Sequence, residues 1–351
     1  MGYAIDTLNS IRNNASQEYK NRVPQATQDN ITAIGRYMSE YDNIYNEFIT
    51  SLLHKIGKTI VSTALFENKL KRFKAGKVLT GQDVEDIFVA SFRTAEGEYD
   101  AEGGMGENGV HPFKRRDYQD ATVYYYRMNR RDKYVITIYR DDVVRAFNSE
   151  TALETFITAQ FNSMYAGAEL DEFEHMKKLL AEAIKAGDFF SYLVPQIGKS
   201  GATDADNQSA CKAFARTVKK AIADVSYPST SYNSAGVKKA TKKNNLVLFI
   251  NKDIAPHLDV DLYSTIFGAD YAKLGIEVIE LDNFGDDTTG TYALLCEDTF
   301  FKCFDVKNQM ASLFNPEGLY ENHWLHIWQI LAYCKFATAV RFGTAEVTTG
   351  A

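Results

Sequence analysis

The chain has 351 residues, of which 45% are hydrophobic and 13% aromatic, so it can bury a large core and is not disordered as a whole. Its formal net charge of −7 excludes general coating of nucleic acid, which requires clustered lysine and arginine. That charge leaves open a container that encloses nucleic acid without binding it.

The N-terminal segment, residues 1–40, is rich in Asn, Gln and Ser and has few apolar positions. This composition predicts an extended or partly helical arm that gains order by docking. Apolar residues at helical spacing then predict a helix over Tyr41–Ile56. The β-branched string KTIVSTALF predicts a strand over Lys58–Phe66.

A long arm follows. Val84–Phe92, Ala121–Arg127 and Tyr134–Tyr139 have strand patterns, and an acidic, Gly-rich tip around Glu96–Gly106 separates the first from the second. The tip has almost nothing to bury, so it must either stay in solvent or lie on another surface. The pattern favours a subunit that contacts its own copies.

The next segment, Ser149–Ala186, keeps helical spacing for an unusual length. Ser149 is a candidate N-cap, Gly167 marks a candidate kink, and Gly187 occupies the position of a C-terminal cap. At 1.5 Å per residue the helix would be about 50 Å long. The simplest interpretation of its apolar stripe is a core face.

The remainder mixes helices and strands without regular βαβ alternation, so the predicted fold class is α+β. Two helices, one of them short, are expected at Ala210–Val225 and Leu262–Phe267, and a loop at Ile197–Asn207. The expected strands are Leu246–Asn251, Ile276–Leu281, Tyr292–Cys296 and Phe300–Val306, and Trp324–Phe342 closes the chain with dense apolar residues. Four widely spaced cysteines among apolar neighbours predict buried, reduced thiols in a reducing compartment.

Signals for catalysis are weak. Gly198-Lys199-Ser200 resembles the end of a phosphate-binding loop, but Leu193 stands where that motif needs its first glycine. His323 and His326 are three residues apart, so on a helix they could share a face and bind a metal, but their aromatic neighbours favour a core or interface role. We therefore predict no catalytic residue, cofactor or metal, and a soluble nucleotide-binding enzyme is the weakest alternative. No apolar run approaches the roughly 20 residues that span a bilayer, so no membrane partner is expected.

Charged residues of opposite sign gather on the arm. Between copies they would orient a subunit contact, whereas within one chain they would form surface ion pairs of little energetic value. A solvated charged loop is the other interpretation. The candidate contact residues are Glu96, Glu98, Asp100, Glu102, Lys114, Arg115, Arg116, Arg127, Arg130 and Arg131.

Several strings resemble a known family. They are GQDVEDIFV (Gly81–Val89), HPFKR (His111–Arg115), MNRRDKYVITI (Met128–Ile138), FNSMYAGAELDEFEHMKKLL (Phe161–Leu180) and the stretch from Leu313 to Phe342. Together with the order of arm, hairpin, long helix and compact C-terminal part, they are similar to the major capsid protein of short-tailed, small-genome tailed phages, which has the Hong Kong 97-type fold.

The resemblance implies an organisation of the chain. Residues 1–57 would be the N-terminal arm and lead-in helix, and 84–139 an extended loop over a neighbouring subunit. Residues 58–83 and 140–187 would form a peripheral domain with the spine helix, completed by later strands. Residues 188–342 would be mainly an axial domain, and 343–351 a C-terminal tail.

The resemblance also implies a function. It is that of a structural protein that assembles into pentamers and hexamers of an icosahedral shell around phage double-stranded DNA, without sequence-specific binding. Its partners would be further copies, a portal and a separate scaffolding protein, with assembly in the host cytoplasm and a final place in the virion capsid. An encapsulin-like compartment shell is the main alternative.

Overall fold

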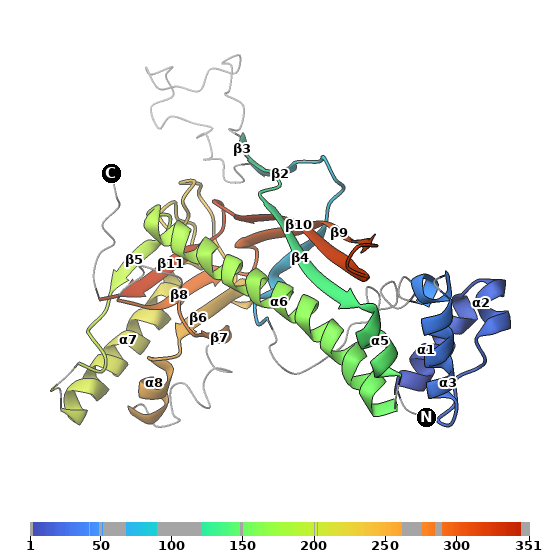
Figure 1. Ribbon diagram of the computed structural model, residues 1–351. Helices are drawn as coiled ribbons and strands as arrows, with labels where there is room; N and C mark the ends of the chain where they lie inside the picture. Colours follow the sequence, from blue (N-terminus) through green and yellow to red (C-terminus); the bar gives the residue numbers. More distant parts are fainter. Residues whose placement is uncertain are drawn as a thin grey trace, which may run out of the picture.

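A computed structural model describes residues 3–41, 43–48, 51, 68–89, 121–147, 150–199, 201, 203–261, 276–284 and 290–344. It contains an N-terminal group of helices, a four-stranded sheet and a five-stranded sheet, with one long helix lying along both sheets (Figure 1). A separate two-stranded hairpin rises from the body. This mixture of helices and sheets confirms the predicted α+β class.

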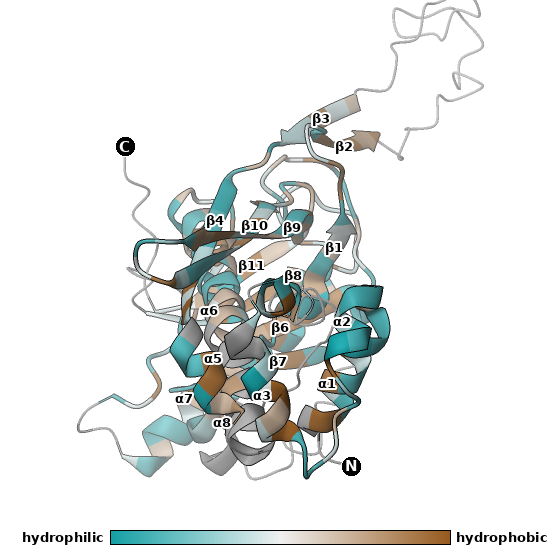
Figure 2. Ribbon diagram, turned by 45° about the vertical axis from the view of Figure 1, so that its right-hand side comes forward, coloured by the Kyte–Doolittle hydropathy of each residue, from teal (hydrophilic) through white to brown (hydrophobic). Residues whose placement is uncertain are grey.

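The N-terminal residues are helical rather than extended. Helices α1 (Tyr3–Asn14), α2 (Gln17–Arg22) and α3 (Ile31–Glu40) are followed by a helical stretch at 43–48. Their sparse apolar side chains are buried together with Phe48, Phe147 and neighbouring residues of the body. The few apolar residues therefore suffice for order because they all meet one small core, and polar residues cover its outside (Figure 2).

The arm is a hairpin whose two strands leave the body together. β2 (Val84–Val89) pairs antiparallel with β3 (Ala121–Tyr126), as the alternating patterns predict. The tip between them lies outside the described residues, and so does the predicted strand at Lys58–Phe66. β4 (Arg130–Tyr139) begins four residues before the predicted strand and joins a different sheet.

Helix α6 (Glu150–Lys185) has 36 residues and continues through Gly167 without a break. It ends where the sequence predicts, because Gly187 adopts a φ of 75° that a side chain would disfavour. The Gly187 amide donates to the Ile184 carbonyl and the Asp188 amide to the Ala183 carbonyl. These two bonds form a Schellman cap. The short helix α5 (Arg140–Ala146) precedes α6.

The four-stranded sheet has the order β1-β9-β10-β4. β1 (Lys74–Lys77) follows a short 3₁₀ turn at Lys71–Phe73. β9 (Phe301–Asn315) and β10 (Tyr320–Tyr333) form a long antiparallel hairpin, longer than the sequence patterns predict. The inner face of this sheet packs on α6 and the N-terminal helices, whereas the opposite face has no described element over it.

The five-stranded sheet has the order β5-β11-β8-β6-β7. Its strands are β5 (Phe190–Leu193), β6 (Leu246–Asn251), β7 (Glu277–Leu281), β8 (Thr291–Glu297) and β11 (Ala339–Gly343). Helix α7 (Asp204–Asp224) packs on one face and the C-terminal half of α6 on the other. Both faces of the central strands are therefore buried, as the apolar string LVLFIN predicts. The turn at Lys243–Asn245 and helix α8 (Ala255–Asp261) complete this part, and the predicted helix at Leu262–Phe267 lies outside the described residues.

All four cysteines are buried free thiols, as predicted. Burial raises the pKa of Cys303 to about 12 and that of Cys296 well above its usual value. These thiols are therefore protonated and unreactive at neutral pH. Among the described helices, none is long and apolar enough to cross a membrane.

Candidate assembly surfaces

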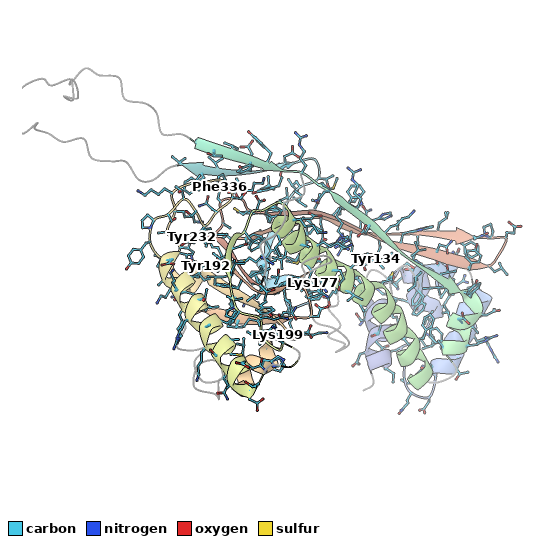
Figure 3. The ribbon with its side chains drawn as sticks, turned by 90° about the vertical axis from the view of Figure 1, so that its left-hand side faces the viewer. Tyr134, Lys177, Tyr192, Lys199, Tyr232 and Phe336 are labelled. Carbon is cyan, nitrogen blue, oxygen red and sulfur yellow. The ribbon has the colours of Figure 1, made fainter. Side chains whose placement is uncertain are left out.

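The base of the β2–β3 hairpin is fixed to the body by aromatic packing. Residues alternate along β2, so Phe88 faces inward while Ile87 faces outward. The Phe88 ring lies 5.4 Å from the Phe336 ring and the Tyr124 ring 5.1 Å from it, centroid to centroid. Figure 3 shows Phe336 directly beneath the hairpin. The hairpin therefore leaves the body in a direction set by three aromatic side chains.

A polar cluster adds to this anchor. The Asp86 carboxylate lies 3.2 Å from Lys302 Nζ and accepts hydrogen bonds from the Tyr126 hydroxyl at 3.4 Å and Cys334 Sγ at 3.1 Å. Burial, reinforced by Asp86, raises the pKa of Cys334 to about 11. Because Asp86 and Tyr126 belong to the hairpin and the other two to the body, the cluster ties the two parts together.

The outer face of the hairpin base is apolar and uncovered within the described residues. Ile87 is 55% exposed, Val89 51% and Tyr125 60%. Apolar side chains that gather on one face of a protruding element usually mark a contact surface. In an isolated subunit this face would remain in contact with water.

A buried polar network holds the four-stranded sheet on α6. Gln329 of β10 donates from Nε2 to Glu172 of α6 and to Asp305 of β9, each at 2.7 Å. Lys74 of β1 lies 3.0 Å from the Glu172 carboxylate and 2.8 Å from that of Asp305. Burial disfavours the charged form of Lys74, but the two carboxylates outweigh it and raise the ammonium pKa. The Gln329 carbonyl accepts from Arg130 Nη1 of β4 at 2.7 Å. The network thus reaches all four strands of the sheet.

A second buried cation joins α6 to the five-stranded sheet. Lys177 is only 1% exposed and places Nζ 2.9 and 3.0 Å from the two oxygens of Asp282, which follows β7. Glu174 Oε1 lies 2.7 Å away on the same helix. Burial opposes ionisation of Asp282, but Lys177 outweighs it and lowers the carboxyl pKa. Helix α6 is therefore fixed to both sheets by charged groups, not by apolar contact alone; Figure 3 labels Lys177 on this helix.

Three of the ten predicted contact residues lie in the described part of the chain. Arg127 is exposed beside the hairpin, with Nε 3.0 Å from Asp83. Arg130 is only 4% exposed and belongs to the network just described, so its side chain is committed within its own chain. Arg131 is exposed and lies over the Trp328 ring at 5.3 Å. The remaining seven, at positions 96–116, lie outside the described residues.

The uncovered side of the four-stranded sheet, here named the open face, forms a continuous surface. It consists of the outward residues of three paired strands. They are Arg131, Lys133, Val135, Thr137 and Tyr139 of β4; Tyr320, Asn322, Trp324, His326 and Trp328 of β10; and Lys307, Gln309, Ala311, Leu313 and Asn315 of β9. Arg131 is predictable from the sequence as a contact residue, but the surface as a whole is not, because its members are up to about 200 residues apart and meet only through strand pairing.

The loop at Gly198 and Lys199, whose sequence resembles a phosphate-binding motif, lies in structural surroundings unlike those of such a motif. Leu193, at the position of the missing first glycine, ends β5, which is an edge strand of its sheet. The Gly198 amide donates to Asn207 Oδ1 at 3.3 Å, so one potential phosphate donor already has a partner. At the start of α7 a capping box between Thr203 and Asp206 satisfies two further amides. These contacts are those of a structural loop.

The two candidate metal-binding histidines point to opposite faces, because β10 is a strand and they are three residues apart. His323 is buried, and burial lowers its pKa to about 4, whereas His326 lies on the open face. Both ring nitrogens of His323 lack a hydrogen-bond partner, and Nε2 lies 3.8 Å from Glu321. The described residues contain no group of three or more potential metal ligands.

Comparison with solved structures defines the class of protein to which the fold belongs. The chain superposes with a TM-score of 0.59 on a chain of the capsid structure of Staphylococcus phage Andhra, at 12% identity, covering 82% of this chain and 88% of that one. A chain from a structure of bacteriophage P68 gives the same TM-score at 14% identity, with the same coverage. At these identities the likeness establishes the fold, which is that of tailed-phage capsid proteins.

Sequence comparison gives the family. Residues 8–343 match the model of the Phi29-like phage major capsid protein, and the chain belongs to this family. It is 32% identical to the major capsid protein of Bacillus phage B103 over 345 residues, covering 98% of this chain and 73% of that protein. It is 30% identical to the major capsid protein of Bacillus phage PZA, and the match covers 98% of this chain and 74% of that protein. The protein is therefore a structural capsid shell protein of the virion, as the resemblance implied.

Proposed function

We propose that the chain assembles, as pentamers and hexamers, into an icosahedral shell that encloses phage double-stranded DNA. Membership of the capsid family is the observation that carries this proposal. Its net charge of −7 suits a container that does not bind the packaged polyanion. A portal and a separate scaffolding protein would be its partners, and assembly would take place in the host cytoplasm.

The two sheets correspond to two functional units. The four-stranded sheet with α6 would be the peripheral domain, and the five-stranded sheet with α7 the axial domain that groups around the symmetry axes. The hairpin with its tip would be the extended loop that contacts a neighbouring subunit. The exposed apolar face at Ile87, Val89 and Tyr125 supports this role, because covering it would contribute to each contact.

The charged residues of the arm would orient that contact. Acidic residues of the tip in one copy would face basic residues such as Arg127 and Arg131 of another. A single such contact is weak, but a shell multiplies it over many copies, so modest interfaces are sufficient for assembly.

Electron microscopy of the purified protein, expressed alone and with its scaffolding protein, tests the proposal. Uniform closed shells, tubes or capsomer rings are expected. Deletion of residues 98–109 should weaken assembly while α6 and both sheets stay folded, which circular dichroism would report. A monodisperse monomer under both conditions would contradict the shell function, and normal shells from the deletion variant would contradict the role of the tip.

A further inference from the structure

The outer side of helix α7 carries a stripe of positive charge. Exposed cations recur at helical spacing over about two turns of the helix, at Lys212, Arg216, Lys219 and Lys220. Between Asn207 and Ala223 the helix contains no aspartate or glutamate. Its opposite side, which includes Phe214, Val218 and Ile222, is buried on the five-stranded sheet. In this stretch, therefore, every charge that α7 presents to solvent is positive.

A second basic segment extends the stripe at the C-terminal end of α7. The Thr241 amide donates to the Val225 carbonyl at 2.9 Å, so the segment before β6 lies against the end of the helix. Lys242 and Lys243 follow directly, and both are exposed. These two lysines and the four cations of the helix are here named the α7 stripe.

The cations of the α7 stripe have no counter-charges of their own. None of the six forms an ion pair with any residue that the structure describes. The protein as a whole has a net charge of −7, so the stripe differs in sign from its surroundings. Six exposed cations without counter-charges on one surface indicate a partner that supplies negative charge.

We infer that the α7 stripe is a contact site for the phosphate backbone of the duplex DNA that the shell encloses. This inference rests on the proposed shell function and adds to it the surface at which the DNA lies closest to the protein. The net negative charge of the rest of the molecule keeps the contact weak and local, which distinguishes it from the general coating of nucleic acid that the composition excludes.

The composition of the stripe favours a polyanion over another protein. Specific protein contacts are centred on buried apolar or aromatic side chains, and α7 exposes no large apolar side chain. Duplex DNA carries one negative charge per about 1.7 Å of its axis, so it presents about seven charges along the roughly 12 Å between Lys212 and Lys220. Five of the six cations are lysines, which bind phosphate as point charges without a fixed geometry. A duplex of any sequence can therefore neutralise the stripe.

The α7 stripe and the β2–β3 hairpin lie on opposite sides of the molecule. The hairpin rises beyond the four-stranded sheet, whereas α7 lies on the face of the five-stranded sheet that is turned away from α6 (Figures 1 and 3). Copies related by the rotation axes of a closed shell all present the same side to its interior. Contact with enclosed DNA therefore assigns the α7 side to the inner surface of the shell and the open face to its outer surface.

Lysine footprinting of whole particles tests the contact directly. Empty and DNA-filled shells are treated with a small amine-acetylating reagent, and mass spectrometry measures the acetylation of each lysine. Lys212, Lys219 and Lys220 should react about threefold less or lower still in filled shells, because phosphates cover them. Lys133 and Lys307 of the open face should react equally in both. Equal acetylation of α7 in the two kinds of shell would overturn the inference, and so would an α7 stripe that is already protected in empty shells, since another copy would then cover it.

Fluorescence anisotropy with a labelled duplex of about 20 base pairs gives a second test on free subunits. At about 50 mM salt, Lys212→Gln/Lys219→Gln/Lys220→Gln should weaken binding about tenfold or more and make the slope of log K against log salt shallower by about 2–3. The matched control Arg131→Gln/Lys133→Gln/Lys307→Gln removes the same charge from the open face and should change the affinity much less. None of these six side chains is buried, so both variants should keep the wild-type circular dichroism.

The outcomes separate this inference from the proposed function. Equal loss of affinity in the two variants, an unchanged affinity of the α7 variant, or no binding of the duplex by the wild-type protein at that salt would overturn the inference alone. Absence of wild-type shells would instead refute the proposed function.

Discussion

Gln329 is the residue whose replacement most directly tests the buried network of the four-stranded sheet. It is 2% exposed, and its amide group donates to Glu172 and Asp305 at 2.7 Å each. Gln329→Glu keeps the size of the side chain and its acceptor for Arg130, but replaces the two donated hydrogens by a negative charge. The variant therefore changes electrostatics in the network with little change in packing.

The expected cost follows from the interactions lost. A hydrogen bond to a charged group stabilises by about 1.5–3 kcal/mol, and two of them disappear. Two carboxylates then face the new one, although Lys74 and Arg130 offset part of the repulsion. We expect the free energy of unfolding at pH 7 to fall by about 3–5 kcal/mol. Gln329→Met, which removes these two hydrogen bonds and the acceptor for Arg130 without adding charge, should lower the free energy of unfolding by about 3 kcal/mol, with no dependence on the titration of a new carboxyl group.

Urea unfolding of free subunits, followed by circular dichroism, measures both variants across pH. The neighbouring carboxylates raise the pKa of the introduced carboxyl in the folded state above its value of about 4.3 in the unfolded chain. The folded state then binds the proton more tightly, so the deficit of Gln329→Glu should shrink as the pH falls through that raised pKa. A difference in stability between the two variants that does not change with pH would refute the reasoning.

Three further predictions concern the hairpin base, the helix cap and the buried histidine. Phe336→Ala should lower the free energy of unfolding by about 3–5 kcal/mol and speed hydrogen exchange in β2, because it removes the ring on which Phe88 and Tyr124 pack. Unchanged exchange in β2 would contradict the role of Phe336 as an anchor of the hairpin. Gly187→Ala should lower the free energy of unfolding by about 1 kcal/mol, because a side chain disfavours the φ of 75° at this position. The melting temperature should fall accordingly, and an unchanged melting temperature would argue against the left-handed cap. Burial lowers the pKa of His323 to about 4, whereas the unfolded chain binds the proton with a pKa of about 6.5. The contribution of the neutral imidazole to the free energy of unfolding is therefore present above about pH 6.5 and is lost as the pH falls from there toward 4. His323→Leu should therefore flatten the loss of stability in that window, and an unchanged pH profile would contradict it.

The local elements follow from the sequence because their causes are local. Helical spacing and Gly187 predict α6 and its end, and alternating or apolar strings predict β2, β3 and β6. The family is also predictable, since strings of the hairpin and the spine helix carry the resemblance that the family match confirms. By contrast, the sparse apolar residues of the N-terminal segment left extended and helical forms open, because order there depends on a core shared with α5.

The surfaces of this protein depend on tertiary structure. Arg130 and Arg131 are adjacent in sequence and similar in chemistry, yet strand alternation buries one in the network beneath the sheet and exposes the other on the open face. Gln329 and Glu172 have no local pattern that predicts their pairing, since 157 residues separate them. The sequence by itself determined the long helices α6 and α7, most strands and the family, because these are encoded in near neighbours. Only strand pairing across the chain decided which charges are buried and which remain available to another subunit.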